Sequence, residues 1–335
     1  MPSTAHSPSV AVVIPLFNGA AHIEEALAGV CAQSAPPQEV IVVDDGSTDD
    51  GPDRARRFAG RLPLKILQKA NGGQSAARNL GVAEACSDWI AFLDQDDVWH
   101  PQHLANLRAA ADNGPAQTGW AYCDVSVVDA AGRLLAPSLL RHRPGRHPKQ
   151  SVDECLAQDM FVLPSAALVA RHAFLAVGGF DERLSGYEDD DLFLRLLCAG
   201  FHSLHVEEPT VLRRSHAAAA SRSIRMERSL MIYARKLLAG FPDRPQEGRF
   251  PSRDLIAPRF CRTLLARWAM AERAGNREAA ALARAGLREL LPHLGPHRRR
   301  IGAVILHVAS MPVVGGACLR AAHGLRQHAR RTSRP

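Results

Sequence analysis

The stretch "EVIVVDDGSTDD", residues 39–50, decides the fold class of this 335-residue chain. Its first half is a continuous run of apolar, mostly β-branched residues, which is typical of a strand buried on both faces. Its second half changes abruptly to carboxylates and a turn. In parallel sheets, ligands bind beyond the carboxyl ends of the strands. The stretch therefore predicts both a central strand and one border of a candidate site.

The same pattern recurs on either side of this stretch. Residues 10–18, "VAVVIPLFN", predict another buried strand, and residues 20–33 have the apolar spacing of a helix. Two more strands are expected at 64–68 and 89–94, with a helix from Ser75 to about Cys86 between them and Ser75 as its N-cap. Strands that alternate with helices at this spacing predict an α/β fold, with a mostly parallel sheet flanked by helices.

Polar side chains follow three of these predicted strands, and they should meet in one crevice. They are Asn18, Asp44, Asp45, Asp94, Asp96 and Asp97. Carboxylate oxygens suit Mg²⁺ or Mn²⁺, and these ions keep positions open for substrate phosphates. An isolated D-x-D or D-D-G-S is common in turns and helix caps. A cation site is favoured here because an unpaired charge next to a buried strand is costly.

Two further stretches place charge at expected helix starts. "NGGQSAARNLG" (71–81) combines a Gly-Gly turn with Arg78, an arrangement that can bind an anion. Arg78 could equally pair with one of the strand-end aspartates. "GYEDDDLFLRL" (186–196) sets four consecutive carboxylates before an apolar run. They could form a solvated first helical turn, or one of them could accept a proton.

The second half of the chain is less regular. A hairpin is expected around Ala131–Gly132, and a strand, a helix and a Gly-Gly turn over 162–184. The last third reads as helical, with a helix pair broken at Gly275–Asn276. Residues 301–319 are apolar but contain His, Ser, Pro and Gly, so an interfacial or buried segment is favoured over a membrane-spanning one.

Charge is distributed unevenly along the chain. The net charge of +7 combines −11 over residues 1–212 with +18 over residues 213–335. A basic part of this kind suits an anionic surface such as phospholipid headgroups, or a nucleic acid, although aromatic residues are few for a nucleic-acid module. Seven cysteines without a C-x-x-C pair give neither a disulfide framework nor a zinc-finger spacing. With no secretory signal visible at the N-terminus, a cytoplasmic location is expected.

Taken together, "VVIPLFN", "VDDGSTD", "NGGQSAARNLG", "FLDQDD", "GGFDE" and "GYEDDDLFLRL", in this order, resemble the family 2 inverting glycosyltransferases. The resemblance implies a GT-A fold, Rossmann-like, over residues 9–216. Residues 217–335 lie outside the resemblance, and their composition and charge predict a basic helical extension that can face a membrane or the acceptor. It implies transfer of a single sugar from a nucleotide-diphosphate donor, with UDP expected, to a hydroxyl of a glycan or lipid-linked acceptor. It also implies Mn²⁺ or Mg²⁺ as cofactor. The basic charge of the last third predicts a peripheral placement at the inner face of the membrane.

The resemblance also implies roles for matching positions. Pro15 would contact the base or ribose through its backbone, and Asp45 would hold the uracil ring with Asp44 beside it. Arg78 would contact the nucleotide, and Asp94 would approach the ribose. Asp96 would ligate the metal that bridges the donor diphosphate.

Two assignments lie farther along the chain. Asp189 falls at the family's catalytic base, and burial among other carboxylates raises the pKa of such a group. Its neighbour Asp190 stands where relatives often carry a bulky residue. His216, in "RRSH", would lie near the diphosphate or the metal, although a solvated loop histidine is the alternative.

Other function classes fit the sequence less well. A sugar-1-phosphate nucleotidyltransferase should carry basic residues directly after the first strand, and residues 15–25 have none. A nicotinamide enzyme should carry G-x-G-x-x-G after a strand. A processive polysaccharide synthase should carry Q-x-x-R-W, but Leu264 stands in place of Gln before Arg267–Trp268. A non-catalytic nucleotide binder with a nucleic-acid-binding tail is the remaining alternative.

Overall fold

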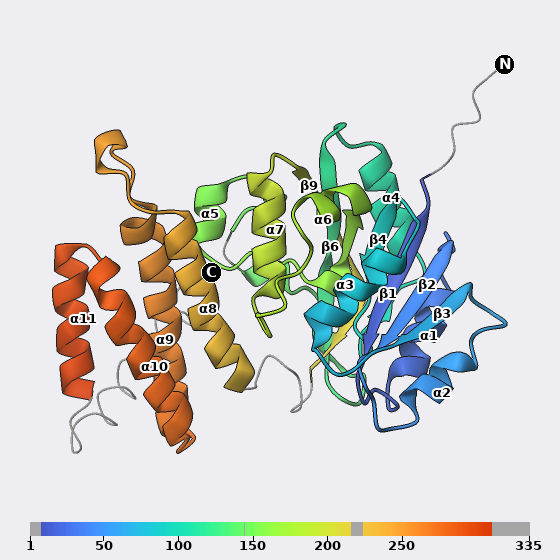
Figure 1. The fold of residues 1–335 in the computed structure, drawn as a ribbon, viewed down its shortest axis with the longest axis horizontal. Coiled ribbons are helices and arrows are strands. Elements are labelled where there is room, and N and C mark those ends of the chain that lie inside the picture. Colours follow the sequence, from blue (N-terminus) through green and yellow to red (C-terminus); the bar gives the residue numbers. More distant parts are fainter. Residues whose placement is uncertain (1–7, 144, 216–223, 310–335) are drawn as a thin grey trace. The chain divides into compact units, whose positions relative to one another are not determined.

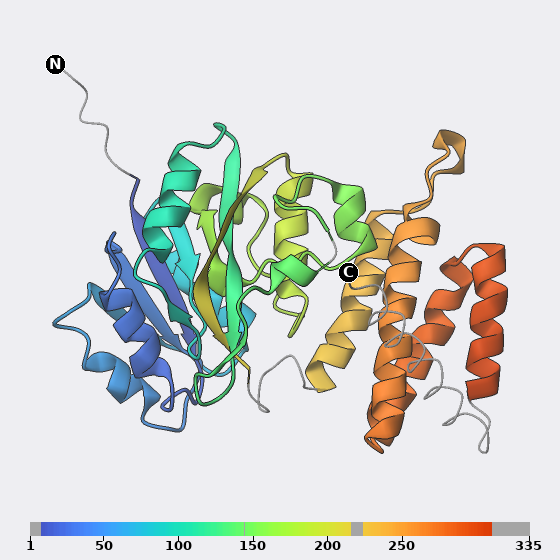
Figure 2. The ribbon, with the colours of Figure 1, turned by 180° about the vertical axis from the view of Figure 1, so that it is seen from behind.

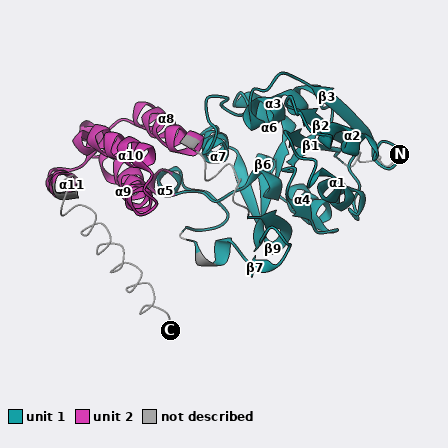
Figure 3. Cartoon of the chain, turned by 90° about the horizontal axis from the view of Figure 1, so that it is seen from below, with its two compact units in different colours: residues 1–155, 159–220 teal, residues 156–158, 221–335 magenta. Residues whose placement is uncertain are grey.

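The computed structural model of the chain describes residues 8–143, 145–215 and 224–309. Two compact units make up the structure. Unit 1 comprises residues 1–155 and 159–220, and unit 2 comprises residues 156–158 and 221–335 (Figure 3). The first is an α/β unit and the second is helical. Each is described by itself below.

Unit 1 is built on a nine-stranded sheet with the order β3-β2-β1-β4-β8-β6-β9-β5, in which β7 pairs with β6. Strands β3, β2, β1 and β4 are all parallel, and so is the β6–β9 pair, whereas β8, β5 and β7 run antiparallel to their neighbours. The mostly parallel sheet predicted from the sequence is thus confirmed. The strands are β1 (Val10–Leu16), β2 (Glu39–Asp44), β3 (Leu64–Gln68), β4 (Trp89–Phe92), β5 (Val98–Trp99), β6 (Thr118–Val128), β7 (Leu134–Ala136), β8 (Ala167–Ala170) and β9 (His202–Arg214).

Helices cover both faces of this sheet, as expected for fully buried strands (Figures 1 and 3). Helices α1 (Ile23–Cys31) and α4 (His103–Asp112) lie on one face, which is turned to the viewer in Figure 2. Helices α3 (Gln74–Glu84) and α6 (Arg171–Ala176) lie on the other. The remaining helices of this part are α2 (Gly51–Arg56), α5 (Val152–Ala157) and α7 (Glu188–Cys198).

Close packing of α3 on the sheet depends on a glycine. A Cβ atom on Gly81 would lie 2.4 Å from Cγ1 of Val13, and both residues are buried. Helix α3 therefore approaches β1 more closely than a larger residue would allow. Because the site residues described below project from the start of this helix, the same contact fixes their distance from the sheet.

Several local predictions are confirmed, and one is wrong. The predicted hairpin turns at Gly132 (φ 80°), and Gly178 and Gly179 both have positive φ angles (81° and 70°) in the predicted Gly-Gly turn. Ser75 is not the N-cap of α3: the cap is Gly73, and the Ser75 hydroxyl donates to the carbonyl oxygen of Leu184 (3.2 Å). Left-handed backbone at Gly73 (φ 92°) moves the helix start one residue earlier.

The residues of unit 2 that the structure describes form four longer helices, which are α8 (Ile224–Gly240), α9 (Ala257–Arg273), α10 (Arg277–Leu290) and α11 (Pro296–Ala309). The predicted break at Gly275–Asn276 is confirmed. Gly275 has φ 66°, and Oδ1 of Asn276 caps α10 by accepting the Ala279 N–H (3.0 Å). None of the helices within the described ranges is both long and apolar enough to span a bilayer.

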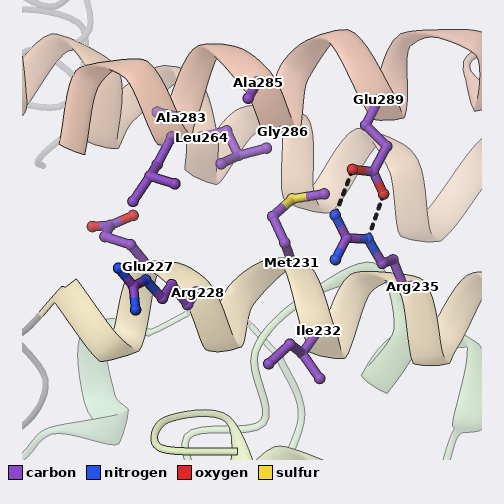
Figure 4. Close-up of a pocket in the computed structure, with 11 residues that line it drawn as sticks. Glu227, Arg228, Met231, Ile232, Arg235, Leu264, Ala283, Ala285, Gly286 and Glu289 are labelled. Atoms are coloured by element: carbon purple, nitrogen blue, oxygen red, sulfur yellow. Dashed lines mark hydrogen bonds and ion pairs between the residues drawn. The ribbon is translucent and has the colours of Figure 1, made fainter. Parts of the chain in front are cut away.

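A groove of about 320 Å³ runs between α8 and α10 (Figure 4). Met231 and Ile232 from α8, with Leu264 from α9, give it apolar walls. Two hydrogen bonds between Arg235 and Glu289, of 2.6 and 2.7 Å, join α8 to α10 beside these walls. The groove therefore belongs to the packing of this helical layer.

Candidate active site

The first two parallel strands end in loops that are hydrogen-bonded to each other. Asp44 is the last residue of β2, and its Oδ1 accepts the backbone N–H of Ser47 (2.8 Å), which closes the turn. Oδ1 of Asn18, in the loop after β1, accepts the N–H of Thr48 (2.8 Å). Pro15 is buried inside β1 opposite Val43, one position before the strand ends. The predicted residues Pro15 and Asp44 thus lie on neighbouring strands at the same edge.

Asp45 organises the entrance to α3. Its Oδ1 accepts the ammonium group of Lys69 (2.7 Å) and the N–H of Gly72 (2.8 Å), and its Oδ2 accepts the N–H of Gly73 (2.7 Å). The side chain is nearly fully buried. Two carboxylate oxygens offer about four acceptor positions, and the loop occupies three of them. Lys69 was not singled out from the sequence, although it directly precedes the quoted Gly-Gly stretch.

Arg78 is buried between two carboxylates. Its NH2 group contacts Oδ1 of Asp94 (2.5 Å), its NH1 group lies 3.5 Å from Oε1 of Glu188, and the guanidinium lies over the ring of Phe180. The aspartate pairing weighed as an alternative from the sequence is therefore present. Asp94 follows β4 and Glu188 opens α7, so this one cation joins two elements that are far apart in the chain.

Three carboxylates follow β4 in close succession. Asp97 is buried, its Oδ1 accepts the N–H of Arg214 (3.2 Å), and a hydrogen bond links it to the side chain of Ser165. Burial raises the pKa of Asp97 to about 8, and the charges of Asp94 and Asp96 add to the shift. Asp94 and Asp96 are partly exposed. This concentration of negative charge is what a cation would relieve.

Gln95 joins this acidic loop to the loop after β1. Its Oε1 accepts the N–H of Phe17 (2.8 Å), and its Nε2 donates to the carbonyl oxygen of Phe17 (3.1 Å). The fit is tight, because a Cβ atom on Gly19 would lie 2.5 Å from Oε1 of Gln95. The two strand-end loops are thereby held at a fixed separation.

Arg214, at the end of β9, is a residue of this edge that the sequence did not point out. It is buried, and its guanidinium donates to the carbonyl oxygen of Asp96 (3.4 Å), to that of Ala130 (3.2 Å) and to Oε2 of Glu25 (2.6 Å). Arg214 therefore stabilises the backbone of the acidic loop by a contact from the end of β9. The only sequence signal was its place in the quoted "RRSH".

The four consecutive carboxylates of α7 have different surroundings. Three of them are buried and have partners: Glu188 accepts from the Gln74 amide and from the Gly186 N–H (2.6 Å), Asp190 from the Met160 N–H (3.0 Å), and Asp191 from the guanidinium of Arg195 in the same helix (2.9 Å). Asp191 lies inside the helix and does not cap it. These contacts explain why so much like charge is tolerated at one helix start.

Asp189 differs from its three neighbours. It is partly exposed, and among the described residues its carboxylate accepts a single hydrogen bond, from the N–H of Asp190 (2.9 Å). Burial, with the charges of Glu188 and Asp190, raises the pKa of Asp189 well above its ordinary value, while nearby Arg78 opposes the shift. A carboxylate with these properties can take up a proton at a higher pH than an ordinary aspartate, as a general base requires.

The donor set suits a hard divalent cation. Asp94 and Asp96 present carboxylate oxygens beside the buried Asp97. No group of three or more possible ligands gathers into a complete cation cage within the described part of the chain. Mg²⁺ and Mn²⁺ need only one or two protein carboxylates when substrate phosphates complete the coordination. His216, the other predicted ligand, lies outside the described residues.

The contacts bring the described candidates together at one edge of the sheet of unit 1. Asp45 binds the first residues of α3, Gln74 of that helix binds Glu188, and Arg78 binds Asp94. Positions that are more than a hundred residues apart in the chain thus border the same polar edge. This is the carboxyl edge of β1, β2 and β4, where open α/β sheets bind ligands.

Comparison with known proteins gives the site its context. Residues 11–174 match the model of glycosyl transferase family 2. An uncharacterized glycosyltransferase of Rickettsia prowazekii is 29% identical over 225 residues, which are 65% of this chain and 67% of that protein. The matched share of the curated relatives falls as low as 18%, in an O-antigen biosynthesis protein of Myxococcus xanthus.

Solved structures agree on the fold. The S. aureus TarS fragment 1–349, determined in complex with UDP-GlcNAc, superposes with a TM-score of 0.64 at 17% identity and covers 89% of this chain and 86% of its own. A mannosyltransferase of Pyrobaculum calidifontis, in complex with GDP-Man and Mn²⁺, gives a TM-score of 0.56 at 19% identity, with 95% and 87% covered. The strand-end carboxylates, the GT-A architecture and the family match lead to one conclusion: residues 11–174 belong to glycosyl transferase family 2, and the chain is a glycosyltransferase.

Proposed function

We propose that this glycosyltransferase moves a single sugar from a nucleotide diphosphate to a hydroxyl acceptor with inversion at the anomeric carbon, and that UDP carries the sugar. The nucleotide binds along the carboxyl edge of β1 and β2. Pro15 contacts the base or ribose, Asp45 and Asp44 hold the base, and Asp94 with Arg78 lies toward the ribose. TarS was determined with UDP-GlcNAc, which supports this choice of donor, whereas the mannosyltransferase was determined with GDP-Man.

In this proposal Mn²⁺ or Mg²⁺ is held by Asp96, with His216 as a further candidate ligand. The cation, when bound, offsets the negative charge of the donor diphosphate. The concentration of carboxylates after β4, with the raised pKa of Asp97, supports a cation there. Arg214 donates to the carbonyl oxygen of Asp96, and Gln95 of the same loop binds the backbone of Phe17, so these two residues fix the loop that carries Asp96.

Asp189 acts as the general base. It takes the proton of the acceptor hydroxyl while the hydroxyl oxygen forms a bond to the anomeric carbon. The bond from that carbon to the diphosphate oxygen breaks on the opposite face, and its electron pair leaves with the nucleoside diphosphate. A positioned base contributes about 10²–10⁴-fold to such a step. The observation that carries the proposal is that Asp189 alone, of four adjacent carboxylates, is partly exposed and without a side-chain partner among the described residues.

The acceptor is a glycan or a lipid-linked intermediate of cell-surface glycan synthesis. We place the enzyme in the cytoplasm, at the inner face of an anionic membrane. The O-antigen biosynthesis protein among the relatives supports this class of product, and the +18 net charge of residues 213–335 supports the placement. Membership of family 2 favours glycosyl transfer over the nucleotidyltransferase and non-catalytic alternatives.

A hydrolysis screen tests the proposal. The purified chain is incubated with UDP-, GDP- and dTDP-sugars, each with Mn²⁺, Mg²⁺ or EDTA, and release of the nucleoside diphosphate is measured. We expect slow hydrolysis of one UDP-sugar that requires a divalent cation. Equal release in EDTA would reject the metal dependence, and a GDP- or dTDP-sugar as the preferred donor would reject UDP.

A further inference from the structure

Helix α11 of unit 2 carries an apolar strip that faces solvent. The exposed fractions of Ile301, Val304 and Ile305 are 48%, 62% and 36%. At 3.6 residues per turn, these three positions lie within an arc of about 100° on one side of the helix. An exposed run of large aliphatic side chains on a regular helix marks a contact surface.

The strip is not the side by which α11 is attached to its own unit. A Cβ atom on Gly302 would lie 2.4 Å from Cδ2 of Leu291 and 3.9 Å from Cδ1 of Leu294. Gly302 thus seats the helix against the preceding turn. Ile301 and Val304 point away from this contact, because they lie about 100° and 160° from Gly302 around the helix, whereas Ile305 lies at the near edge of the strip, about 60° from Gly302.

Positive charge borders the strip. Arg298, Arg299 and Arg300 are all exposed in the first turns of α11. Within the described residues, neither Arg299 nor Arg300 forms an ion pair. Arg298 and Arg300 stand on opposite sides of the apolar arc, as the 3.6-residue period requires. From Leu291 to the end of the sequence there are eight arginines and no acidic residue.

We infer that α11 lies on an anionic phospholipid surface, with Ile301, Val304 and Ile305 entering the headgroup boundary and the flanking Arg298 and Arg300 contacting lipid phosphates. This inference rests on the membrane placement in the proposed function and names the surface responsible. Apolar side chains flanked by arginines on one helix are the combination that interfacial helices use. The arginines add electrostatic attraction to a negatively charged leaflet.

The observations favour lipid over the other possible occupants. A nucleic acid would use the arginines but leave the aliphatic strip in water, since bases stack on aromatic side chains. A second copy of the chain would bury the strip but bring two arginine clusters of like charge together. A phospholipid surface can bury the aliphatic strip and pair with the arginines at the same time.

Vesicle sedimentation with the full-length chain tests the inference. The vesicles are made of phosphatidylcholine, with or without phosphatidylglycerol, at low and at raised salt. One variant replaces the strip (I301S/V304S/I305S), and another replaces the charge (R298Q/R299Q/R300Q). Two matched controls act elsewhere on unit 2: Met270→Ser removes an exposed apolar side chain of α9, and R273Q/R277Q/R288Q removes three charges from α9 and α10.

We expect the wild type and both controls to bind vesicles that contain phosphatidylglycerol, more weakly at raised salt. Each α11 variant should bind on the order of 100-fold more weakly. Equal binding by the strip variant and the wild type would overturn the inference. The inference would also be overturned if the charge control lost as much vesicle binding as the α11 charge variant. Wild-type binding to a single-stranded oligonucleotide without binding to vesicles would overturn it as well. A dimer in solution that the strip variant abolishes, without vesicle binding, would assign the strip to a second copy. Donor hydrolysis in the same samples separates this result from failure of the proposed chemistry.

Discussion

At the scale of single residues, the acidic run of α7 shows how one position can be set apart by its neighbours. Glu188 and Asp190 accept hydrogen bonds from other segments, and Asp191 pairs with Arg195 within the helix. Those bonds fix the backbone around Asp189 while leaving its carboxylate partly exposed. Burial, together with the like charges that remain nearby, raises the pKa of Asp189. Structural and chemical roles are thus divided among four adjacent carboxylates.

Replacing Asp189 by Asn should remove the base while keeping the size of the side chain. We expect transfer to fall by about 10²–10⁴-fold, with the dissociation constant for UDP within about threefold of the wild type. Radiolabelled-sugar transfer and calorimetric UDP titration measure the two quantities. Asp190→Asn is the matched control, because an Asn oxygen can still accept the Met160 N–H. Transfer near the wild-type rate in the Asp189 variant would reject the base assignment.

The raised pKa of Asp189 predicts a pH dependence with a definite sign. The base works only when it is ionised, and the ionised fraction grows as pH rises through the pKa. Because that pKa lies above the ordinary aspartate value, the acidic limb of kcat against pH should lie above pH ~4. Asp190→Asn removes one neighbouring negative charge and should move this limb to lower pH. An unchanged limb in that variant would show that a different group titrates.

Arg78 illustrates the cost of removing a buried charge. It is nearly inaccessible and pairs with Asp94 and Glu188. Arg78→Met should leave these carboxylates without their cation and lower the free energy of unfolding by about 3–5 kcal/mol. Urea denaturation followed by circular dichroism measures the change. Adding Glu188→Gln should recover part of the loss, and the absence of any recovery would contradict the pairing described here.

At the scale of elements, the sequence predicted the first half of unit 1 well because its strands are continuous apolar runs. Strand β3 coincides with the predicted residues 64–68, and β2 occupies the apolar half of the opening stretch. Strand β9 was not predicted. It contains Pro209 and two glutamates, which argue against a strand, and it forms because β6 pairs with it along its length.

The residues of the candidate site also fall into two groups, those that the sequence predicted and those that it did not. Carboxylates that end buried strands could be identified from local sequence, because strand and turn signals are local. The supports of the acidic loop could not. Arg214 binds the carboxylate of Asp97 across 117 positions, and Ser165 binds the N–H of Asp94 across 71. No spacing rule connects residues that far apart, so only the folded chain brings them together.

Helix α10 offers a test at the level of one element. Oδ1 of Asn276 accepts the N–H of Ala279, which satisfies one donor of the first helical turn. Asn276→Ala should lower the free energy of unfolding by about 1 kcal/mol. Asn276→Ser should keep most of this free energy, because a serine side chain can also cap the start of the helix. Calorimetric unfolding measures both, and equal stability of the Ala variant and the wild type would show that the cap contributes nothing.

At the scale of the whole molecule, an acidic unit 1 carries the carboxylate edge, and a basic helical unit 2 carries the exposed strip of α11. The family assignment rests on residues 11–174, so the main part of unit 2, residues 221–335, lies outside the matched region. The charge asymmetry is therefore a property of two separate parts of the chain. Transfer chemistry and surface attachment can accordingly be tested one at a time.

The most direct test of the central claim is calorimetric titration of UDP into the wild type and Asp96→Ala, each with Mn²⁺ and with EDTA. If the strand-end carboxylates assemble one cation and one nucleotide, UDP should bind the wild type with Mn²⁺ and at least about tenfold more weakly in EDTA, since Mn²⁺ then links protein and phosphate. Asp96→Ala should bind weakly under both conditions. Undiminished binding by the variant with Mn²⁺, or by the wild type in EDTA, would contradict the account.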